Sequence, residues 1–592
     1  MSCHSIATRK RGRMRIACLD HKPSAAFTPY PNDLVVDCKQ QSIRHFDVLF
    51  LMSLQMIRFS ILFTILLIGP IFSCGECRAD SRPNIVVLLV DDLGYADIRP
   101  ERMPKTAALS QRGTQLNLYT HQNCAPTRVA LMTGRYPYDF NIPSVYPPPT
   151  YQGVPTDVKM VSTHLKDAGY HCGCFGKWHL GWQDRWQWPT RRGFDEFVGT
   201  LGGHITSYGT LRDGFPHANG YVGHDHHGMH DMQINEVPLY TSRYSTHLFR
   251  DGALRFIEKA SQRDQPFFMY VPFNAPHGPF SAPREYVDRA FATGDFDPSL
   301  IDKLQEIPGD ILTADQSKPQ DVHDTARLMY AASVFAVDDA VADIYQKLEE
   351  KGEADNTLLL FASDNGVSYT YDPSSRYRTP NLVGSSAPLS GQKGSNAEGG
   401  IRVANFAIWP GRIAPGQVID SKIWIGDLAP TFMQIAGVSI PEEIDGGTIL
   451  HAIDSNRPVF RRHGQTLIPY MIKFAFNNDT VPEASYSGRI VVIWRWRKYT
   501  RRIYWDADWN QLDRIEETMF DIDNDPGERN NLTEALPGVL ERARVQYQSL
   551  GGDSIFDQID VISRAGVWSG FQSTVDFGFD DPQQVLESNL VP

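Results

Sequence analysis

The segment NCAPTRVALMTGRYP, residues 123–137, contains a cysteine whose neighbouring residues could make its sulfur chemically reactive. Cys124, Pro126 and Arg128 are spaced as Cys-x-Pro-x-Arg, and a proline at this point suits the first turn of a helix. A side chain at a helix start faces unpaired backbone N–H groups, which favour an anionic ligand. The alternative is a buried structural cysteine followed by a surface arginine. The spacing therefore marks Cys124 as a candidate functional sulfur.

Oxygen-bearing side chains stand at the ends of two largely apolar segments, residues 83–92 and 356–366, that are typical of strands buried on both faces. These side chains are Asp91, Asp92, Asp364 and Asn365. The carboxyl ends of parallel strands line the active crevice of such sheets, so we expect the four groups to lie together. Carboxylate and amide oxygens suit calcium or magnesium better than zinc. Strand-terminal turns with solvated acids are the alternative.

Lysines and histidines in further segments could bring positive charge and proton transfer to the same crevice. Lys177 and His179 alternate in GKWHLG, and alternate residues of an extended segment point to one face. His277 follows a predicted buried strand at residues 266–274, and Lys393 lies in the loop LSGQKGSNAEGG. Taken singly, each of these residues is as readily structural or solvated.

Buried strands alternate with helical periodicity along most of the chain. Helices are expected at residues 156–168, 324–351 and 426–437. This order indicates an α/β fold with a large, mostly parallel sheet flanked by helices. After about residue 455, the segment RIVVIWRWRKYTRRIYW predicts antiparallel strands. The predicted organisation is a leader at 1–79, a catalytic α/β domain at 80–455 and a smaller C-terminal α+β subdomain at 456–592.

The leader contains the features of a secretory signal peptide at residues 56–79. Arg58 precedes an apolar run of roughly 15 residues, and a small-residue exit ends at Ala79. Such a run is shorter than the about 20 residues that a membrane span needs. We therefore expect Met56 to be the true start and the protein to be exported, whether periplasmic, cell-surface or secreted. A signal anchor and lipoprotein cleavage at Cys74 are the alternatives.

Composition and the positions of the cysteines argue against a nucleic-acid-binding protein and against a fold held together by disulfides. The chain has 592 residues and a formal net charge of -12, which argues against nucleic acid as the main partner. The last of its eight cysteines is Cys174, so no disulfide framework holds the remainder of the chain. The sequence leaves the redox state of Cys172 and Cys174 open.

The residues that follow the cysteine motif, Leu-Met-Thr-Gly-Arg at 131–135, make the segment resemble the signature of the sulfatase family. This resemblance implies an alkaline-phosphatase-like fold and oxidation of Cys124 to formylglycine by a maturation enzyme. In the family, one hydroxyl of the hydrated aldehyde attacks sulfur, and the second hydroxyl later expels sulfate. The resemblance also implies one bound Ca²⁺, held by residue 124 and four oxygen ligands. These ligands are Asp91, Asp92, Asp364 and Asn365.

The resemblance implies a role for each basic side chain as well. Lys177 and Lys393 would bind sulfate, while His277 would bind sulfate and protonate the leaving alcohol. His179 would accept a proton from the formylglycine hydrate, and Arg128 would hold the formylglycine and the metal ligands. Together with Ca²⁺, these cations would stabilise the charge that spreads over the oxygens as the S–O bond breaks.

The resemblance extends from about residue 83 to about residue 532. The segment PTRRGFDEFVG resembles the arylsulfatase B type, which implies N-acetylgalactosamine 4-sulfate or an aryl sulfate as substrate. The implied partners are that substrate, or a sulfated glycan, and the formylglycine-generating enzyme. Two rival interpretations are a phosphonate or phosphate ester hydrolase of the same fold and a non-catalytic glycan-binding protein. Lys177 and Lys393, which stand where such phosphate-ester enzymes need a second metal, favour sulfate.

Other polar groups are expected to lie outside the chemistry. Glu398 belongs to a glycine turn, and the Asp338-Asp339 pair lies in a helical stretch, so all three are interpreted as structural. Residues 217–232 contain five histidines and two aspartates, but their spacing matches no zinc motif. A solvated or substrate-side loop is the better interpretation of this segment. Its candidates for a sugar contact are His230 and Asp231.

Overall fold

A mixed eight-stranded sheet organises the fold. Its strands, in spatial order, are β16 (Asn405–Ile408), β13 (Thr357–Ser363), β1 (Asn84–Val90), β9 (Phe267–Pro272), β3 (His171–Lys177), β4 (Glu196–Thr200), β7 (Met232–Ile234) and β8 (Val237–Pro238). The five strands from β13 to β4 pair in parallel, and antiparallel strands complete both edges. The mostly parallel sheet predicted from the sequence is therefore confirmed.

The computed structural model describes much of the chain after the leader. The described residues are 82–140, 142, 153–182, 184–203, 225–226, 229–239, 241, 243–278, 280–307, 310–314, 322–371, 378–461, 470–473, 486–494, 496–505 and 512–549. They belong to one unit, Arg78–Pro592. The predicted signal peptide at 56–79 and most of the histidine-rich segment at 217–232 lie outside the described residues.

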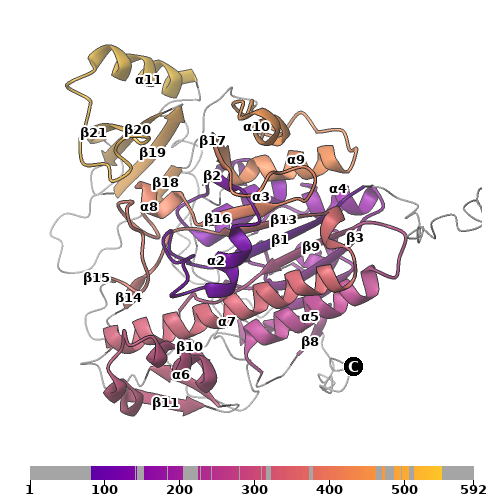
Figure 1. The fold of residues 1–592 in the computed structure, drawn as a ribbon. Helices are drawn as coiled ribbons and strands as arrows, with labels where there is room; N and C mark the ends of the chain where they lie inside the picture. Colours follow the sequence, from indigo (N-terminus) through magenta and orange to yellow (C-terminus); the bar gives the residue numbers. More distant parts are fainter. Residues whose placement is uncertain are drawn as a thin grey trace, which may run out of the picture. The chain divides into compact units, whose positions relative to one another are not determined.

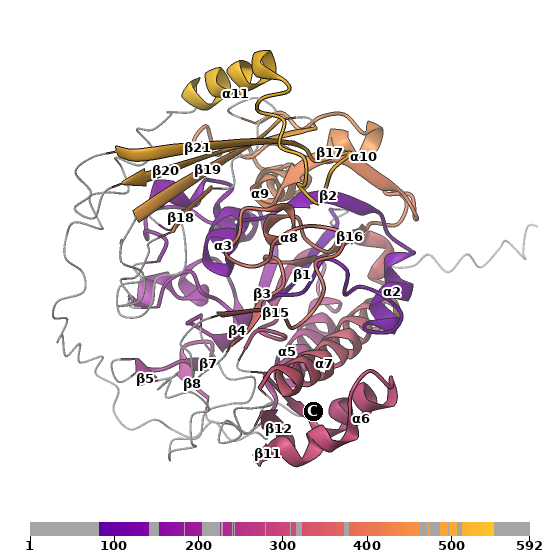
Figure 2. The ribbon, with the colours of Figure 1, turned by 90° about the vertical axis from the view of Figure 1, so that its left-hand side faces the viewer.

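Helices cover both faces of the sheet, as Figures 1 and 2 show. On one face lie α5 (Ser245–Ala260) and the long α7 (Val322–Glu350); on the other lie α3 (Cys124–Thr133), α4 (Val161–Asp167) and α9 (Leu428–Ile435). Every residue of β1 is buried, because a strand inside a parallel sheet is covered from both sides. The β-branched and leucine run of this strand is the sequence signal of that position.

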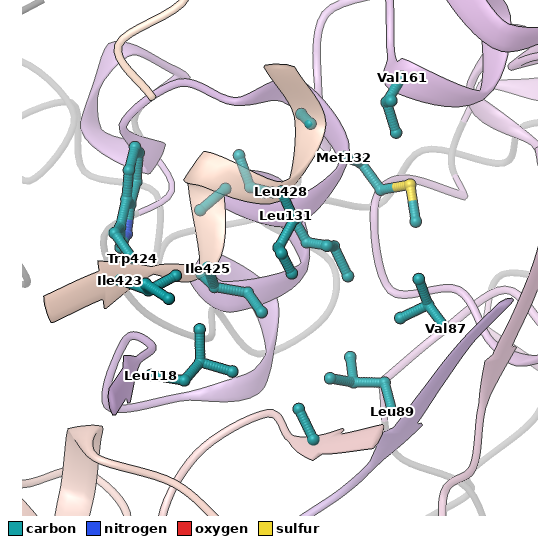
Figure 3. Close-up of a cluster of buried hydrophobic side chains, with 14 of the residues drawn as sticks. Val87, Leu89, Leu118, Leu131, Met132, Val161, Ile423, Trp424, Ile425 and Leu428 are labelled. Atoms are coloured by element: carbon teal, nitrogen blue, oxygen red, sulfur yellow. The ribbon is translucent and has the colours of Figure 1, made fainter. Parts of the chain in front are cut away.

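Alternate side chains of β1 enter separate halves of the core. Val86 and Leu88 pack in the cluster that includes α5 and α7, whereas Val87 and Leu89 point to the α3 side. Figure 3 shows Val87 and Leu89 below Met132 of α3, in the same apolar cluster. The core therefore fixes α3, the helix that begins at Cys124, against the central strand.

Most predicted elements have the expected type. The apolar runs at 83–92, 266–274 and 356–366 form β1, β9 and β13, and the periodic stretch at 324–351 forms α7. The helix expected at 156–168 is shorter than predicted. It begins only at Val161, because the preceding residues form a turn in which the Val158 N–H donates to the Pro155 carbonyl.

The C-terminal part contains the predicted antiparallel strands. These are β18 (Tyr470–Lys473), β19 (Tyr486–Trp494), β20 (Arg497–Trp505) and β21 (Leu512–Asp521), which pair in this order and precede α11 (Pro537–Ser549). The tryptophans and arginines that alternate in the sequence lie where β19 ends and β20 begins, at the paired residues Trp494 and Arg497.

Shorter elements complete the described structure. They are α2 (Pro104–Ser110), β2 (Gln115–Tyr119), β5 (Asp225–His226), β6 (Met229–His230), β10 (Ser281–Pro283), α6 (Arg284–Ala292), β11 (Leu304–Ile307), β12 (Ile311–Ala314), β14 (Tyr369–Tyr371), β15 (Arg378–Leu382), α8 (Glu398–Ile401), β17 (Val418–Trp424) and α10 (Leu450–Ser455). Among the described residues, no helix combines the length and apolar character that a membrane span requires.

Candidate active site

Polar side chains from separate strands meet at the carboxyl edge of the central sheet. Asp91 and Asp92 follow β1, and Asp364 and Asn365 follow β13. The parallel register pairs Val90 with Ser363, which places the two strand ends side by side. All four polar side chains are buried. The structure therefore brings together the four oxygen-bearing side chains that the sequence analysis proposed as metal ligands.

The backbone turns sharply at Asp92, whose φ of 68° lies in the left-handed region. Its N–H donates to Asp364 Oδ1 at 3.2 Å, and its Oδ1 accepts from Asn365 Nδ2 at 2.7 Å. Lys393 Nζ donates to Asp92 Oδ2 at 2.8 Å, and His277 Nε2 lies 3.8 Å from the same oxygen. Asp92 thus links the strand ends to the loop cations.

Arg128 and Lys177 surround Asp91. Arg128 Nη2 lies 2.8 Å from Asp364 Oδ2 and 3.4 Å from Asp91 Oδ2, and its Nη1 donates to the Lys177 carbonyl at 2.8 Å. Lys177 Nζ forms an ion pair with Asp91. The guanidinium is therefore fully buried and contacts both Asp364 and Asp91, which excludes the surface-arginine alternative.

The pKa values of the two neighbouring carboxyls, Asp91 and Asp364, are shifted in opposite directions. Burial opposes ionisation of Asp91, but the nearby Lys177, His277 and Arg128 hold its pKa well below the ordinary value. Burial together with the charge of Asp91 raises the pKa of Asp364. A crevice that contains strongly shifted carboxyls in a water-poor setting is typical of a functional site.

Cys124 is the first residue of α3 and is 2% exposed. One ligand atom each of Asp91, Cys124 and Asp364 lies within 4.8 Å of the others. Burial raises the pKa of the Cys124 thiol, although Lys177 and Lys393 act in the opposite direction. The unmodified side chain is consequently a thiol and not the thiolate that nucleophilic cysteine chemistry needs.

The residues downstream of Cys124 hold the helix in place. Gly134 ends α3 with a φ of 67°, a left-handed conformation that glycine adopts without strain. Its carbonyl accepts from the N–H groups of Asp445 and Gly446 at 3.0 Å, and Tyr136 N donates to Asp445 Oδ2 at 2.9 Å. The Leu-Met-Thr-Gly-Arg part of the motif therefore anchors the far end of the helix that presents Cys124.

The donor set fits a hard divalent cation. Asp91 Oδ1 and Asn365 Oδ1 are buried and have no hydrogen-bond partner among the described residues. Leaving such atoms unsatisfied is unfavourable, and a cation that coordinates oxygen would satisfy both. A second group, Asp91, Asp92 and His277, also lies within 4.8 Å. Three carboxylates and an amide around one crevice suit calcium or magnesium better than zinc.

His277 lies at the rim of this crevice. It follows β9, and its side chain is 17% exposed. Burial and the neighbouring Lys393 lower the pKa of His277 to about 4. A ring proton on Nδ1 donates to the Gly278 carbonyl, so in the neutral ring Nε2 is the acceptor that faces Asp92. The resting histidine is neutral near pH 7.

The geometry of His179 differs from the prediction. β3 ends at Lys177, and His179 has a φ of 56°, so the segment from Lys177 to His179 is not extended. The alternation argument is therefore wrong for this pair. The His179 ring is buried against the chain at Gly203, where an added β-carbon would lie 2.1 Å from Nε2. A backbone bend, rather than strand alternation, orients this histidine.

Several polar groups outside the crevice are structural, as expected. Glu398 accepts from Tyr119 Oη at 2.9 Å and from Lys498 Nζ at 3.1 Å. Asp338 accepts the Thr106 N–H at 2.6 Å, near the start of α2. Asp231, for which the sequence analysis suggested a sugar contact, has a buried carboxylate that accepts the Gly202 N–H at 2.6 Å.

Two further observations go beyond the sequence prediction. Cys172 and Cys174 are buried and form no disulfide with each other in the described structure. Tyr270 was missed: its hydroxyl lies 3.5 Å from Arg128 Nη1, inside the site. A hydroxyl-bearing residue within the otherwise apolar run of β9 was the available signal.

Comparisons with known proteins agree with this arrangement. Residues 83–438 match the family model described as Sulfatase, and residues 396–537 match one described as N-sulphoglucosamine sulphohydrolase, C-terminal. The N-acetylgalactosamine-6-sulfatase of Mus musculus is 30% identical over 414 residues, which cover 66% of this chain and 70% of that protein. Arylsulfatase J of Mus musculus is 27% identical over 384 residues, covering 63% and 56% of the two chains.

Solved structures give the same result. The structure titled Ps i-CgsB in complex with k-i-k-neocarrahexaose aligns with a TM-score of 0.60 at 27% identity, covering 79% of this chain and 92% of that one. The mostly parallel sheet with helices on both faces places the chain in the alkaline-phosphatase-like α/β class. Since the family model spans more than half of its length, the chain belongs to the sulfatase family. It is a sulfuric ester hydrolase.

Proposed function

We propose that this sulfatase hydrolyses a sulfate ester on a sugar, using a formylglycine made from Cys124 and one Ca²⁺. The observation that carries the proposal is the position of Cys124. It stands at the buried N-terminus of α3, with its sulfur within 4.8 Å of carboxylate oxygens of Asp91 and Asp364. An ordinary thiol has a raised pKa there, whereas a hydrated aldehyde would offer hydroxyl groups to both substrate and metal.

Calcium would be held by the oxygens of Asp91, Asp92, Asp364 and Asn365, together with residue 124. When bound, it would supply positive charge that stabilises developing charge on the sulfate oxygens. In the described site, the three carboxylates are balanced by Arg128, Lys177 and Lys393. A divalent cation would therefore leave the crevice positively charged, which favours an anionic ester.

Each basic side chain has a task consistent with its contacts. Lys177 and Lys393, each ion-paired to a ligand aspartate, would turn part of their charge toward the sulfate oxygens. Arg128 is too deeply buried to reach substrate, so it would position Asp91 and Asp364. Its role is thus in orienting the metal ligands.

Two histidines would carry out the proton transfers. The negative charge of a bound sulfate would raise the pKa of His277 from its resting value of about 4, which favours the protonated ring that a leaving alkoxide needs. His179 would accept a proton from the formylglycine hydrate. Its left-handed backbone and the close approach of Gly203 restrict the ring, as a positioned base requires.

A sugar sulfate is the substrate class that the relatives favour. One relative is an N-acetylgalactosamine-6-sulfatase, and a solved relative contains a bound neocarrahexaose. We propose sulfated N-acetylgalactosamine as the first substrate to test, with the ester at O4, as the arylsulfatase B-like segment suggests, and at O6. The partner in maturation would be a formylglycine-generating enzyme.

The test is sulfate release combined with the mass of the peptide that contains Cys124. Protein co-expressed with a formylglycine-generating enzyme should release sulfate from the 4-sulfate or 6-sulfate sugar, or from 4-nitrophenyl sulfate, in a calcium-dependent way. The peptide should show aldehyde or its hydrate at position 124. An active protein whose peptide carries only the thiol would overturn the mechanism, and faster hydrolysis of 4-nitrophenyl phosphate would overturn the substrate class.

We also propose that residues 1–79 are a leader, that 80–455 and 456–592 are the catalytic domain and C-terminal subdomain, and that the protein is exported. The motif at 56–79 supports cleavage near Ala79. N-terminal sequencing of protein secreted by its native host would test this. A mature chain that keeps the apolar run would support the signal-anchor alternative instead.

A further inference from the structure

The loop that carries Lys393, residues 390–398, is closed at its ends. The Gly399 N–H donates to the Ser390 carbonyl at 2.6 Å, so the chain returns to its starting point just after the loop. Figures 1 and 2 show α8, which begins at Glu398, next to the C-terminal strands. Contacts at this junction therefore influence the shape of the whole Lys393 loop.

Glu528, from the turn that follows β21, contacts both ends of the Lys393 loop. Its Oε2 accepts from Ser390 Oγ at 3.0 Å and from the Glu398 N–H at 2.8 Å. Because both donors bind the same oxygen atom, that atom fixes the first residue of the loop relative to the last. The Glu528 side chain is 8% exposed, so little water can compete for these contacts.

Lys498 of β20 holds the other oxygen of Glu528. Its Nζ lies 3.0 Å from Glu528 Oε1 and 3.1 Å from Glu398 Oε1, and its side chain is 1% exposed. Charge-assisted hydrogen bonds are stronger than neutral ones. The buried ammonium group therefore orients the Glu528 carboxylate toward the loop and joins it to the start of α8.

The backbone of Glu528 is also unusual. Its φ of 51° lies in the left-handed region, which is uncommon outside glycine and is concentrated at functional sites. Asp92 and His179, at the catalytic crevice, share this conformation. Asp525 shapes the turn, because its Oδ2 accepts the Arg529 N–H at 2.9 Å. The turn after β21 thus presents Glu528 to the Lys393 loop.

Fixed ends matter for the position of Lys393. Its N–H donates to the Val367 carbonyl at 2.9 Å, and its Nζ lies 2.6 Å from Asp92 Oδ1. Gly391 and Gly394, on either side, have φ values of 82° and 76°, and glycine leaves such conformations at little steric cost. A loop with two such residues would have many alternative shapes if its ends were released, and few of them would direct Lys393 at Asp92.

We propose that Glu528, oriented by Lys498, is a positioning residue of this sulfatase, which fixes both ends of the Lys393 loop and so places the Lys393 ammonium group in the crevice. The proposal rests on the proposed function, in which Lys393 binds the sulfate oxygens. Glu528 takes no part in S–O cleavage. Through this contact, the C-terminal sheet helps to shape the active site.

The experiment is a double-mutant cycle of Glu528→Ala and Lys393→Met, in which kcat/KM for 4-nitrophenyl sulfate is measured on matured protein. Glu528→Ala alone should lower kcat/KM by about 10- to 100-fold, the usual effect of removing a group that orients a functional side chain. In the Lys393→Met background, the same change should cost less than about twofold, because no ammonium group remains to be misplaced. An equal loss in both backgrounds would overturn the proposal, since a merely structural role acts independently of Lys393.

Glu517→Ala is the matched control in the same sheet. Glu517 Oε1 lies 3.1 Å from Arg501 Nη1, and its Oε2 lies 2.5 Å from Nη2 of Arg544 in α11, away from the Lys393 loop. This variant should melt earlier and keep the wild-type kcat/KM. Glu528→Gln, whose amide oxygen can still accept from both ends of the loop, should fall between wild type and Glu528→Ala, and it replaces Glu528→Ala in the cycle if that variant does not fold. A loss in Glu517→Ala as large as that in Glu528→Ala would contradict the proposal.

Hydrogen–deuterium exchange separates this proposal from the proposed function, because it needs no turnover. Peptides that cover residues 389–400 contain the N–H groups of Lys393 and Gly399, both bonded to backbone carbonyls in the wild type. Their exchange should quicken by at least about fivefold in Glu528→Ala and stay unchanged in Glu517→Ala. Faster exchange in a protein that hydrolyses no sulfate ester would show that Glu528 holds the loop and that only the proposed function fails. Unchanged exchange in Glu528→Ala would overturn positioning by Glu528 whatever the activity.

Discussion

Replacing Asp364 by asparagine should remove most of the stabilisation that calcium binding gives to the fold. Asp364 Oδ2 lies 2.8 Å from Arg128 Nη2, and its Oδ1 accepts the Asp92 N–H at 3.2 Å. An asparagine keeps the size of the side chain and one acceptor oxygen. It removes one of the three carboxylates of the crevice and points an amide nitrogen at either the guanidinium or the proposed ion. Calcium affinity should therefore fall steeply.

The magnitude has two separable parts. At calcium concentrations of about 100 and 1,000 times the dissociation constant, binding stabilises the folded wild type by about 2.7 and 4.1 kcal/mol. A variant whose affinity drops 100-fold keeps only about 0.4 and 1.4 kcal/mol of this gain at the same two concentrations. Independently of calcium, weakening the buried Arg128 pair destabilises the variant by up to about 3–5 kcal/mol.

The assay is thermal unfolding in a chelator and in tenfold steps of calcium chloride, because a response to calcium is distinct from a constant loss of stability. Asp338→Asn is the matched control. Asp338 is also a buried carboxylate, but it accepts the N–H groups of Thr106 and Lys105 at 2.6 and 3.1 Å, away from the crevice. This control should melt earlier and still respond fully to calcium.

The reasoning is refuted if Asp364→Asn gains as much stability from calcium as the wild type. It is equally refuted if the wild type shows no response at concentrations up to the millimolar range. A loss of calcium response in Asp338→Asn would show that the assay reports general weakening of the fold rather than occupation of the crevice.

Three further predictions test other parts of the structure. Cys124→Ala should abolish sulfate release while the protein keeps its melting temperature, and Lys393→Met should lower kcat/KM by about 10²–10³-fold, the usual effect of losing one charge-stabilising group. Lys498→Met should destabilise the fold by about 3–5 kcal/mol in chemical denaturation, because it removes the ammonium group 3.1 Å from the buried Glu398 and leaves this carboxylate only the more distant Arg402, at 3.8 Å. Burial lowers the pKa of His121 from 6.5 to about 3, so the unfolded chain binds the proton first and stability is lost as the pH falls through this window. As the pH falls below 6.5, the free energy of unfolding of His121→Gln should therefore decrease less steeply than that of the wild type, by up to about 1.4 kcal/mol per pH unit. Chemical denaturation at a series of pH values measures this difference.

Each of these predictions has a result that contradicts it. More than trace turnover by Cys124→Ala would exclude the formylglycine mechanism. If Lys351→Met, a change at a surface ion pair, lowers kcat/KM as much as Lys393→Met, the effect is not local to the crevice. Lys498→Met with wild-type stability would show that the buried pair is replaceable, and parallel pH profiles for His121→Gln would exclude this histidine as a source of acid sensitivity.

Local patterns predicted the strands, and the clustering of the polar side chains that follow them, because both depend on neighbouring residues. A strand such as β1, covered on both faces, must be apolar throughout, and the polar residues that end it must lie at the sheet edge. Asp91 and Asp364 could therefore be assigned to one crevice before any pairing was known. The helix boundary at Val161 and the conformation of His179 could not, because turns and left-handed residues depend on contacts outside the segment.

The sequence by itself determined which functional groups are present: a cysteine at a helix start, oxygen-bearing side chains at strand ends, and basic side chains in neighbouring segments. Only the tertiary structure decided which charge meets which. It pairs Lys177 with Asp91, Lys393 with Asp92, and Arg128 with both Asp91 and Asp364. It also sets Glu528 against both ends of the loop that carries Lys393. The physical reason is that periodicity and burial are local properties of the chain, whereas these contacts join residues that are dozens to hundreds of positions apart and depend on strand order and register.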